Sequence, residues 1–220
     1  GDEETLITRP RRFGKTLNMD MLNCFFSNKY VGRTELFDSL VIWQEEKYRK
    51  LQGTYPVVFM SFASVKADNL QDAKEQIKAQ IVSLYEEYRY LLESGHLSEN
   101  EIAYYKTVSM EMTDVQATMA LKLLSEYLYR YYGKKVIIIL DEYDTPMQEA
   151  YVNGYWNAFA SFVRNLFNAT FKSNPYMERG MMTGITRVAK ESVFSDLNNL
   201  NVITTTSEEY ETAIVFTEAE

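Results

Sequence analysis

Two hydrophobic periods alternate along this chain. Short runs rich in β-branched and aromatic residues, typical of β-strands, are separated by longer stretches whose apolar residues recur at helical spacing. The predicted strands are residues 5–8, 55–62, 134–141, 178–188 and 202–205. The predicted helices cover residues 15–26, 68–92 and 156–171, with two more that begin near 98 and 113. Strands alternating with helices predict an α/β fold, a parallel sheet of about five strands flanked by helices.

Capping residues in the local sequence predict the boundaries of several helices. Asp68 is the predicted N-cap of the long second helix, and Leu17, Met21 and Phe25 form an apolar stripe on the first. Capping boxes are predicted at residues 98–101 (Ser, Glu) and 113–116 (Thr, Gln), and the helix that starts at the second box ends before Gly133. These helices form a helical insertion between the second and third strands.

The third predicted strand, residues 134–141, ends in the clearest candidate for a metal-binding and catalytic pair. Its five consecutive aliphatic residues, 136–140, predict burial on both faces, as in a central parallel strand. It ends in Asp141 and Glu142, a Walker B-like pair in which Asp141 would help to hold Mg²⁺ and Glu142 would orient or deprotonate water. Two acids that simply end a strand at the surface are the alternative. Asp144 is interpreted as a turn residue before Pro146 rather than as support for this pair.

A second candidate element follows the first strand, where the sequence reads LITRPRRFGKT. A turn at the start of a helix directs several backbone N–H groups and the positive end of the helix dipole at one point, where an anion binds. The backbone of Arg12, Phe13 and Gly14 would contribute to this phosphate site. Lys15 would bind the outer phosphates, and Thr16 would bind Mg²⁺ through its hydroxyl.

This loop departs from the Walker A pattern G-x-x-x-x-G-K-[ST]. Arg9 occupies the first glycine position, and Pro10 removes a backbone N–H. Taken alone, the loop is equally well interpreted as an ordinary turn before a helix. The acidic strand end favours the phosphate site, because ligands of parallel sheets bind at the carboxyl ends of strands, where both elements lie.

Composition narrows the class of protein. The 220 residues are 46% hydrophobic and 25% charged, which is typical of one large soluble domain. The net charge of −8 disfavours direct binding of nucleic acid, and the tight basic cluster Arg9, Arg11 and Arg12 belongs to the phosphate loop. The single cysteine, Cys24, excludes an internal disulfide and is expected to be buried on the first helix. No apolar run is long enough to span a bilayer, so a cytoplasmic location is expected.

Four blocks, RPRRFGKTLN, YPVVFMSF, IIILDEYDTP and TGITRVAKESVFSDLNNL, lie in this order along the chain. Together they resemble the AAA-ATPase-like family of bacterial proteins over nearly all of residues 1–220. The arginine at position 9 matches the pattern of that family. The resemblance implies a P-loop ATPase fold with a catalytic glutamate and an extra strand between the loop strand and the acidic strand. Members usually carry a carboxy-terminal PD-(D/E)XK nuclease-like region, so this chain is expected to be a fragment without that region or a helical lid.

The resemblance also implies that the end of the fourth strand points at the γ-phosphate. Thr186 or Arg187 would then sense the phosphate, and Arg187 would stabilise charge during transfer. A salt bridge from Arg187 to Asp141 or Glu191 is the alternative. Arg164 is interpreted as an exposed helix charge rather than as an arginine finger for a neighbouring subunit.

The sequence therefore predicts a domain that binds ATP and Mg²⁺, hydrolyses ATP and acts as a switch for an effector region. The expected partners are the nucleotide, the nuclease-like region of the full-length protein and a second copy of the chain; no membrane partner is expected. The alternative is a nucleotide-binding or scaffolding module that does not hydrolyse, because Arg9 and Pro10 reshape the loop.

Overall fold

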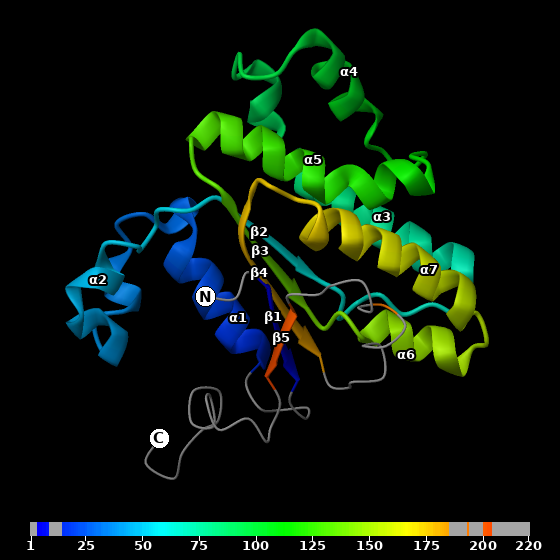
Figure 1. The fold of residues 1–220 in the computed structure, drawn as a ribbon, viewed down its shortest axis with the longest axis horizontal. Coiled ribbons are helices and arrows are strands. Elements are labelled where there is room, and N and C mark those ends of the chain that lie inside the picture. The colour runs from blue at the N-terminus through cyan, green and yellow to red at the C-terminus, as the bar shows by residue number, and fades with distance from the viewer. Residues whose placement is uncertain (1–3, 9–14, 185–192, 194–199, 204–220) are drawn as a thin grey trace.

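The computed structural model describes residues 4–8, 15–184, 193 and 200–203. Its centre is a sheet of parallel strands in the order β2-β3-β4-β1-β5, with helices on both faces (Figure 1). The strands are β1 (Glu4–Thr8), β2 (Val57–Ser61), β3 (Val136–Asp141), β4 (Met177–Gly184) and β5 (Leu200–Ile203). The predicted α/β class with a parallel sheet is confirmed.

Strand β4 lies between β1 and β3, the arrangement that the family resemblance implies. Met182 of β4 is aligned with Leu6 of β1 on one side and with Leu140 of β3 on the other. All three strands run in the same direction, so their carboxyl ends meet at one edge of the sheet. The last residues of β1 and β4, Thr8 and Gly184, are aligned with each other at that edge.

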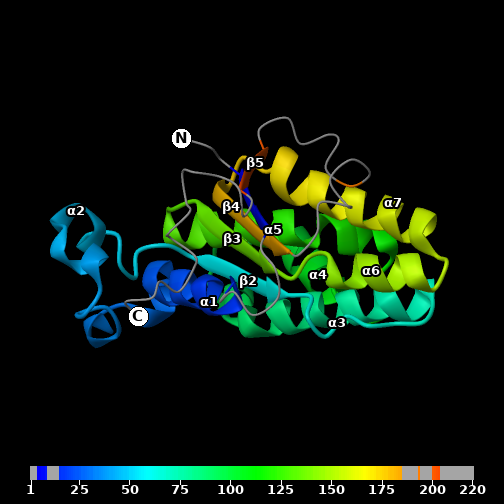
Figure 2. The same ribbon diagram turned by 90° about the horizontal axis from the view of Figure 1, so that it is seen from below.

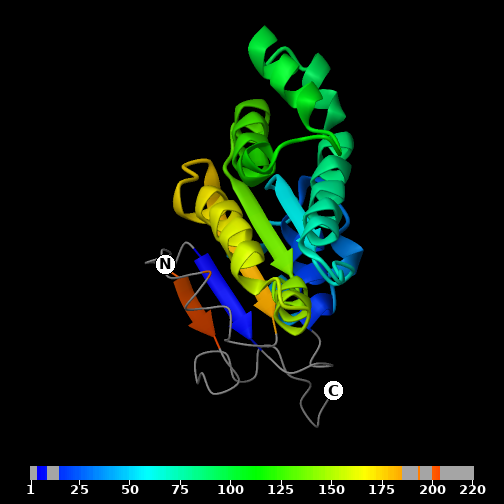
Figure 3. The same ribbon diagram turned by 90° about the vertical axis from the view of Figure 1, so that its right-hand side faces the viewer.

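The main helices pack against this sheet on two sides (Figures 2 and 3). They are α1 (Lys15–Phe26), α3 (Leu70–Glu87), α5 (Asp114–Tyr132), α6 (Thr145–Val152) and α7 (Trp156–Phe167). Helix α4 (Glu99–Thr107) lies beyond α5, away from the sheet (Figure 1). Side chains of a strand alternate between faces. Ile138 and Leu140 of β3 accordingly join the large core with α3, α5 and α7, whereas Ile137 and Ile139 pack with Met19 of α1. β3 is thus buried on both faces, as predicted.

Several predicted boundaries are confirmed. Helix α1 covers residues 15–26, and both capping boxes form, at Ser98–Glu101 before α4 and at Thr113–Gln116 before α5. Gly133 ends α5 with a φ of 65°, a left-handed conformation that glycine adopts at low cost. Helices α3, α4 and α5 lie between β2 and β3 in the chain.

Other boundaries were predicted wrongly. Asn69, not Asp68, caps α3 by accepting a hydrogen bond from the Asp72 N–H, and α3 ends at Glu87. A 3₁₀ turn (Arg89–Glu93) follows α3, and a π-helical turn (Asn168–Lys172) follows α7. The sequence did not predict α6 or the chain of short helical turns between α1 and β2. These turns are Asn28–Tyr30, Thr34–Leu36, Val41–Gln44 and α2 (Glu46–Arg49).

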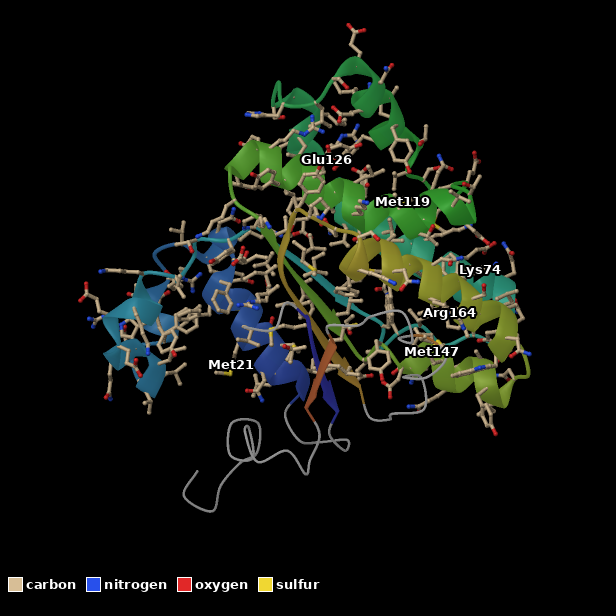
Figure 4. All side chains as sticks on the ribbon, viewed as in Figure 1. Met21, Lys74, Met119, Glu126, Met147 and Arg164 are labelled. Carbon is tan, nitrogen blue, oxygen red and sulfur yellow. The ribbon has the colours of Figure 1, made fainter. Side chains whose placement is uncertain are left out.

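Three smaller expectations have clear outcomes. Cys24 is only partly buried, and burial and the nearby Asp20 raise the pKa of its thiol. Arg164 on α7 is half-buried rather than exposed, and lies on the other face of the sheet from Met21 of α1 (Figure 4). Within the described residues, no helix combines the length and the apolar character needed to cross a membrane.

Candidate functional site

Asp141, the last residue of β3, is completely buried at the carboxyl edge of the sheet. Its Oδ1 accepts a hydrogen bond from the hydroxyl of Thr183 on the neighbouring strand β4. Its Oδ2 is also buried and has no hydrogen-bond partner among the described residues. A buried carboxylate oxygen without a partner is costly, so Oδ2 marks a position where a ligand would be stabilising.

Glu142 follows with a left-handed backbone, at a φ of 51°. In the described part of the chain, no other residue except glycine has a positive φ. Its N–H donates to Thr183 Oγ1 over 3.3 Å, and its Oε2 accepts from Thr145 Oγ1 over 3.1 Å. A side chain held in a sparsely populated backbone region, at the edge where ligands bind, points to a functional constraint.

The turn after Glu142 connects β3 to α6. The Tyr143 N–H donates to the Thr183 carbonyl over 3.0 Å, and the Thr145 N–H donates to the Glu142 carbonyl over 3.1 Å. Tyr143 is fully buried, and this burial raises the pKa of its phenol. Asp144 lies in this turn, as predicted. It is also buried, and its Oδ2 accepts a hydrogen bond from Gln148 Nε2 over 3.2 Å. Hydrogen bonds donated by Tyr143, Thr145 and Gln148 therefore hold the turn that carries Glu142 and Asp144.

The start of α1 lies at the same edge. The carboxyl end of β1 and the amino end of α1 are joined by residues 9–14, and Figure 1 shows both at the edge where β4 ends. Thr16, in the first turn of α1, is exposed, while Met19 one turn later is buried against Ile139 of β3. The structure therefore brings the first turn of α1 to the same side of the sheet as the acidic pair.

Some predicted site residues lie outside the described part of the chain. These are Arg12, Phe13, Gly14, Thr186 and Arg187, as well as the side chain of Lys15. Their roles stay predictions. The acidic pair, Asp141 and Glu142, and the backbone of Lys15 and Thr16 are described and share one edge of the sheet.

Sequence reasoning missed Thr183, which contacts both acids and is itself completely buried. The signal was a hydroxyl residue in the apolar strand MMTG, one position before its end. The resemblance placed this strand beside the acidic strand, but only the structure shows that the hydroxyl of Thr183 reaches the acids.

Comparisons with known proteins identify the family of this chain. The model of a family described as "Predicted AAA-ATPase" matches residues 1–194. The chain belongs to the AAA-ATPase-like family. It is also similar to an uncharacterized protein encoded in the vnfD 5' region of Azotobacter chroococcum mcd 1, with 24% identity over 202 residues. That match covers 91% of this chain and 34% of the relative, so the chain spans about a third of the relative's length. No solved structure matches.

Proposed function

We propose that this chain is a P-loop-type ATPase domain that binds ATP with Mg²⁺ and hydrolyses it. The observation that carries the proposal is the pair of Asp141 and Glu142. Asp141 is buried and its Oδ2 has no hydrogen-bond partner among the described residues, and Glu142 has a left-handed backbone. The pair ends β3, and β4 separates that strand from β1, which leads into the phosphate loop. Membership of a family described as predicted AAA-ATPases supports a nucleotide as the ligand.

The phosphates would be bound between β1 and α1. In this proposal the backbone N–H groups of residues 12–16 and the positive end of α1 would form an anion site, and Lys15 would add a mobile cation. α1 has no acidic residue in its first turn, so nothing there opposes a bound phosphate. Arg9 and Pro10 alter the loop but leave the amides of residues 13–16 available as donors.

The residues present fit a magnesium ion. Oδ2 of Asp141 is a hard oxygen without a partner among the described residues, and Thr16 has an exposed hydroxyl in the first turn of α1. Mg²⁺ typically takes one or two protein oxygens together with substrate phosphates and water. No group of three His, Cys, Asp or Glu residues suited to a metal occurs in the described part of the chain. When bound, the ion would neutralise charge on the phosphates.

Glu142 is the proposed general base. Its carboxylate is half-buried, is held by Thr145 and lies one residue after Asp141, where it would orient or deprotonate water. Thr186 and Arg187 follow β4 in the sequence, and we propose that one of the two senses the γ-phosphate. Arg187 would also stabilise charge during transfer.

The biological role is proposed from the family alone. ATP turnover would switch an effector, the nuclease-like region expected in the full-length protein, and a second copy of this chain is a further candidate partner. The net charge of −8 disfavours nucleic acid as a direct ligand of this domain. We assign the domain to the cytoplasm, the compartment where ATP is abundant.

A non-hydrolysing nucleotide-binding or scaffolding module is the second candidate. The observation that favours it is the replacement of the first loop glycine by Arg9, followed by Pro10. A nucleotide-binding module would differ from the proposed ATPase in turnover alone, whereas a purely scaffolding module would lack both binding and turnover.

Titration calorimetry with ATP and Mg²⁺, together with phosphate release, tests the proposal on the parent chain. Lys15→Ala should weaken ATP binding, because it removes the cation for the outer phosphates. Glu142→Gln should retain binding while turnover falls about a hundredfold, the scale of a lost general base. Phosphate release by the parent no faster than by Lys15→Ala would favour the scaffolding module.

A further inference from the structure

Thr183 makes three contacts with three consecutive residues of the neighbouring strand end. Its hydroxyl donates to Asp141 Oδ1 and accepts from the Glu142 N–H, and its carbonyl accepts from the Tyr143 N–H. The hydroxyl is thereby used in both directions, once as a donor and once as an acceptor. Because Thr183 is completely buried, water does not compete for these bonds.

The two contacts of the hydroxyl replace backbone pairing at the point where the chain turns. The aligned residues of β3 and β4 end with Leu140 and Met182, so Asp141 and Thr183 are the next positions along both strands. There the N–H of Glu142 bonds to a side-chain hydroxyl instead of to a backbone carbonyl. This bond holds the peptide that precedes the left-handed Glu142, a conformation that is costly without such support.

The hydroxyl also decides which oxygen of Asp141 is available. Oδ1 is occupied by Thr183, whereas Oδ2 has no hydrogen-bond partner among the described residues. Without the hydroxyl, the carboxylate could rotate about its terminal torsion, which is broad in aspartate. A single side chain therefore controls the orientation of one acid and the backbone of the next.

We propose that Thr183 is a positioning residue that holds the carboxylate of Asp141 and the backbone of Glu142 in one fixed relation for ATP hydrolysis. The inference rests on the proposed function, in which Asp141 helps to bind Mg²⁺ and Glu142 acts on water. In this proposal Thr183 is given no contact with the nucleotide or the reacting atoms. It acts through its two acidic neighbours, as residues behind metal ligands commonly do.

Thr183→Val and Thr183→Ser separate this role from a packing role. Valine keeps the size of threonine and removes the hydroxyl, while serine keeps the hydroxyl and removes a methyl group. Thr170→Val is the matched control, because Thr170 is equally buried and its hydroxyl has no hydrogen-bond partner in the described part of the chain. Thermal unfolding selects the variants that fold. If Thr183→Val does not fold, Thr183→Cys replaces it, since it differs from Thr183→Ser by one atom.

The measurements are ATP affinity by calorimetry, with Mg²⁺ and with EDTA, and steady-state phosphate release against ATP and Mg²⁺ concentration. For Thr183→Val we expect kcat to fall and the Mg²⁺ concentration for half-maximal turnover to rise, each by about tenfold or more. ATP affinity in EDTA should stay unchanged, and KM for ATP at saturating Mg²⁺ should change little. For Thr183→Ser, kcat and the Mg²⁺ concentration for half-maximal turnover should remain within about threefold of the parent values. For Thr170→Val, both quantities should equal those of the parent.

Two results would overturn the inference while leaving the proposed function intact. One is a folded Thr183→Val with the kcat and Mg²⁺ dependence of an active parent; the other is a Thr183→Ser as impaired as Thr183→Val. Failure of the proposed function looks different, because the parent itself would then bind ATP no better than Lys15→Ala, and the inference would fall with it. If the parent binds ATP but does not release phosphate, the gain in ATP affinity on adding Mg²⁺ is compared between the parent and the Thr183 variants. A smaller gain for Thr183→Val than for the parent and Thr183→Ser supports the inference, and an equal gain overturns it.

Discussion

Gly184 ends β4 directly against the ring of Tyr143. A β-carbon on Gly184 would lie 2.5 Å from Tyr143 Cε1 and 2.8 Å from Asp144 Oδ1. Tyr143 is fully buried and its ring meets Phe167 edge to face, so it has little room to retreat. The close approach of a glycine and a tyrosine thus fixes how the acidic turn sits on the end of β4.

Gly184→Ala should therefore destabilise the fold by about 1–3 kcal/mol, the usual cost of overpacking a buried site. It should also reduce phosphate release, because the displaced turn carries Glu142. Urea denaturation measures the first effect. Gly133→Ala is a useful comparison, since Gly133 has a φ of 65° but open space around it. An alanine at 184 that costs less than the one at 133 would contradict the crowding argument.

The left-handed backbone of Glu142 gives a second prediction. Asparagine adopts positive φ more readily than glutamate, so Glu142→Asn should stabilise the fold by about 0.5–1 kcal/mol. The same change should abolish turnover, because it removes the proposed base. Glu142→Gln removes the charge without changing the backbone preference and should show no such gain. Equal unfolding free energies for Asn and Gln at this position would argue that the left-handed conformation carries no strain.

Mutation can test which residue caps α3, because the sequence predicted Asp68 and the structure has Asn69 in that position. Asn69 accepts a hydrogen bond from the Asp72 N–H over 3.0 Å, whereas Asp68 is exposed one position earlier. Asn69→Ala should cost about 1 kcal/mol of unfolding free energy, and Asp68→Ala should cost close to nothing. Thermal or urea unfolding of the two variants decides the point, and the reverse ranking would restore Asp68 as the cap.

The ion pair between Arg130 and Glu101 predicts a pH dependence. The hydrogen bond from Arg130 lowers the pKa of Glu101 from 4.5 to about 2. A lowered pKa in the folded state stabilises the protein above pH 4.5, and this contribution is lost as the pH falls from there towards 2. Glu101→Gln retains the capping box with Ser98 but removes the charge, and should cost about 1 kcal/mol at pH 7 because water reaches both partners.

Urea denaturation of the parent and of Glu101→Gln at pH 7 and at pH 3 measures this effect. The difference between them should shrink at the lower pH. Glu99→Gln, an exposed acid in the first turn of the same helix, is the control and should show a smaller difference at both pH values. A difference for Glu101→Gln that is independent of pH would mean that the lost group acts through packing.

Local sequence determined much of this fold. The aliphatic run of β3, the two capping boxes and the stop at Gly133 depend on residues within one or two turns of each other, and all formed as predicted. Adjacent cap residues with similar chemistry, Asp68 and Asn69, could not be separated in this way. Helix α6 was missed because Asp144 was interpreted only as a turn residue before Pro146, although proline is also tolerated in the first turn of a helix.

The candidate site likewise contains residues that the sequence identified and a residue that only the tertiary structure revealed. The sequence alone named Asp141 and Glu142, because an acidic pair after a buried strand is a local pattern. The family resemblance implied that β4 lies between β3 and β1, and the structure has this order. Only the tertiary structure decided that Thr183 bonds to both acids, and that Leu17 and Met21 of the predicted apolar stripe are exposed while Phe25 is buried. Helix periods and caps arise from bonds between neighbours in the chain. Strand order depends on pairs as far apart in the chain as Leu6 and Met182, and the choice of which Asp141 oxygen keeps a partner depends on Thr183, 42 positions away. No local pattern records such contacts.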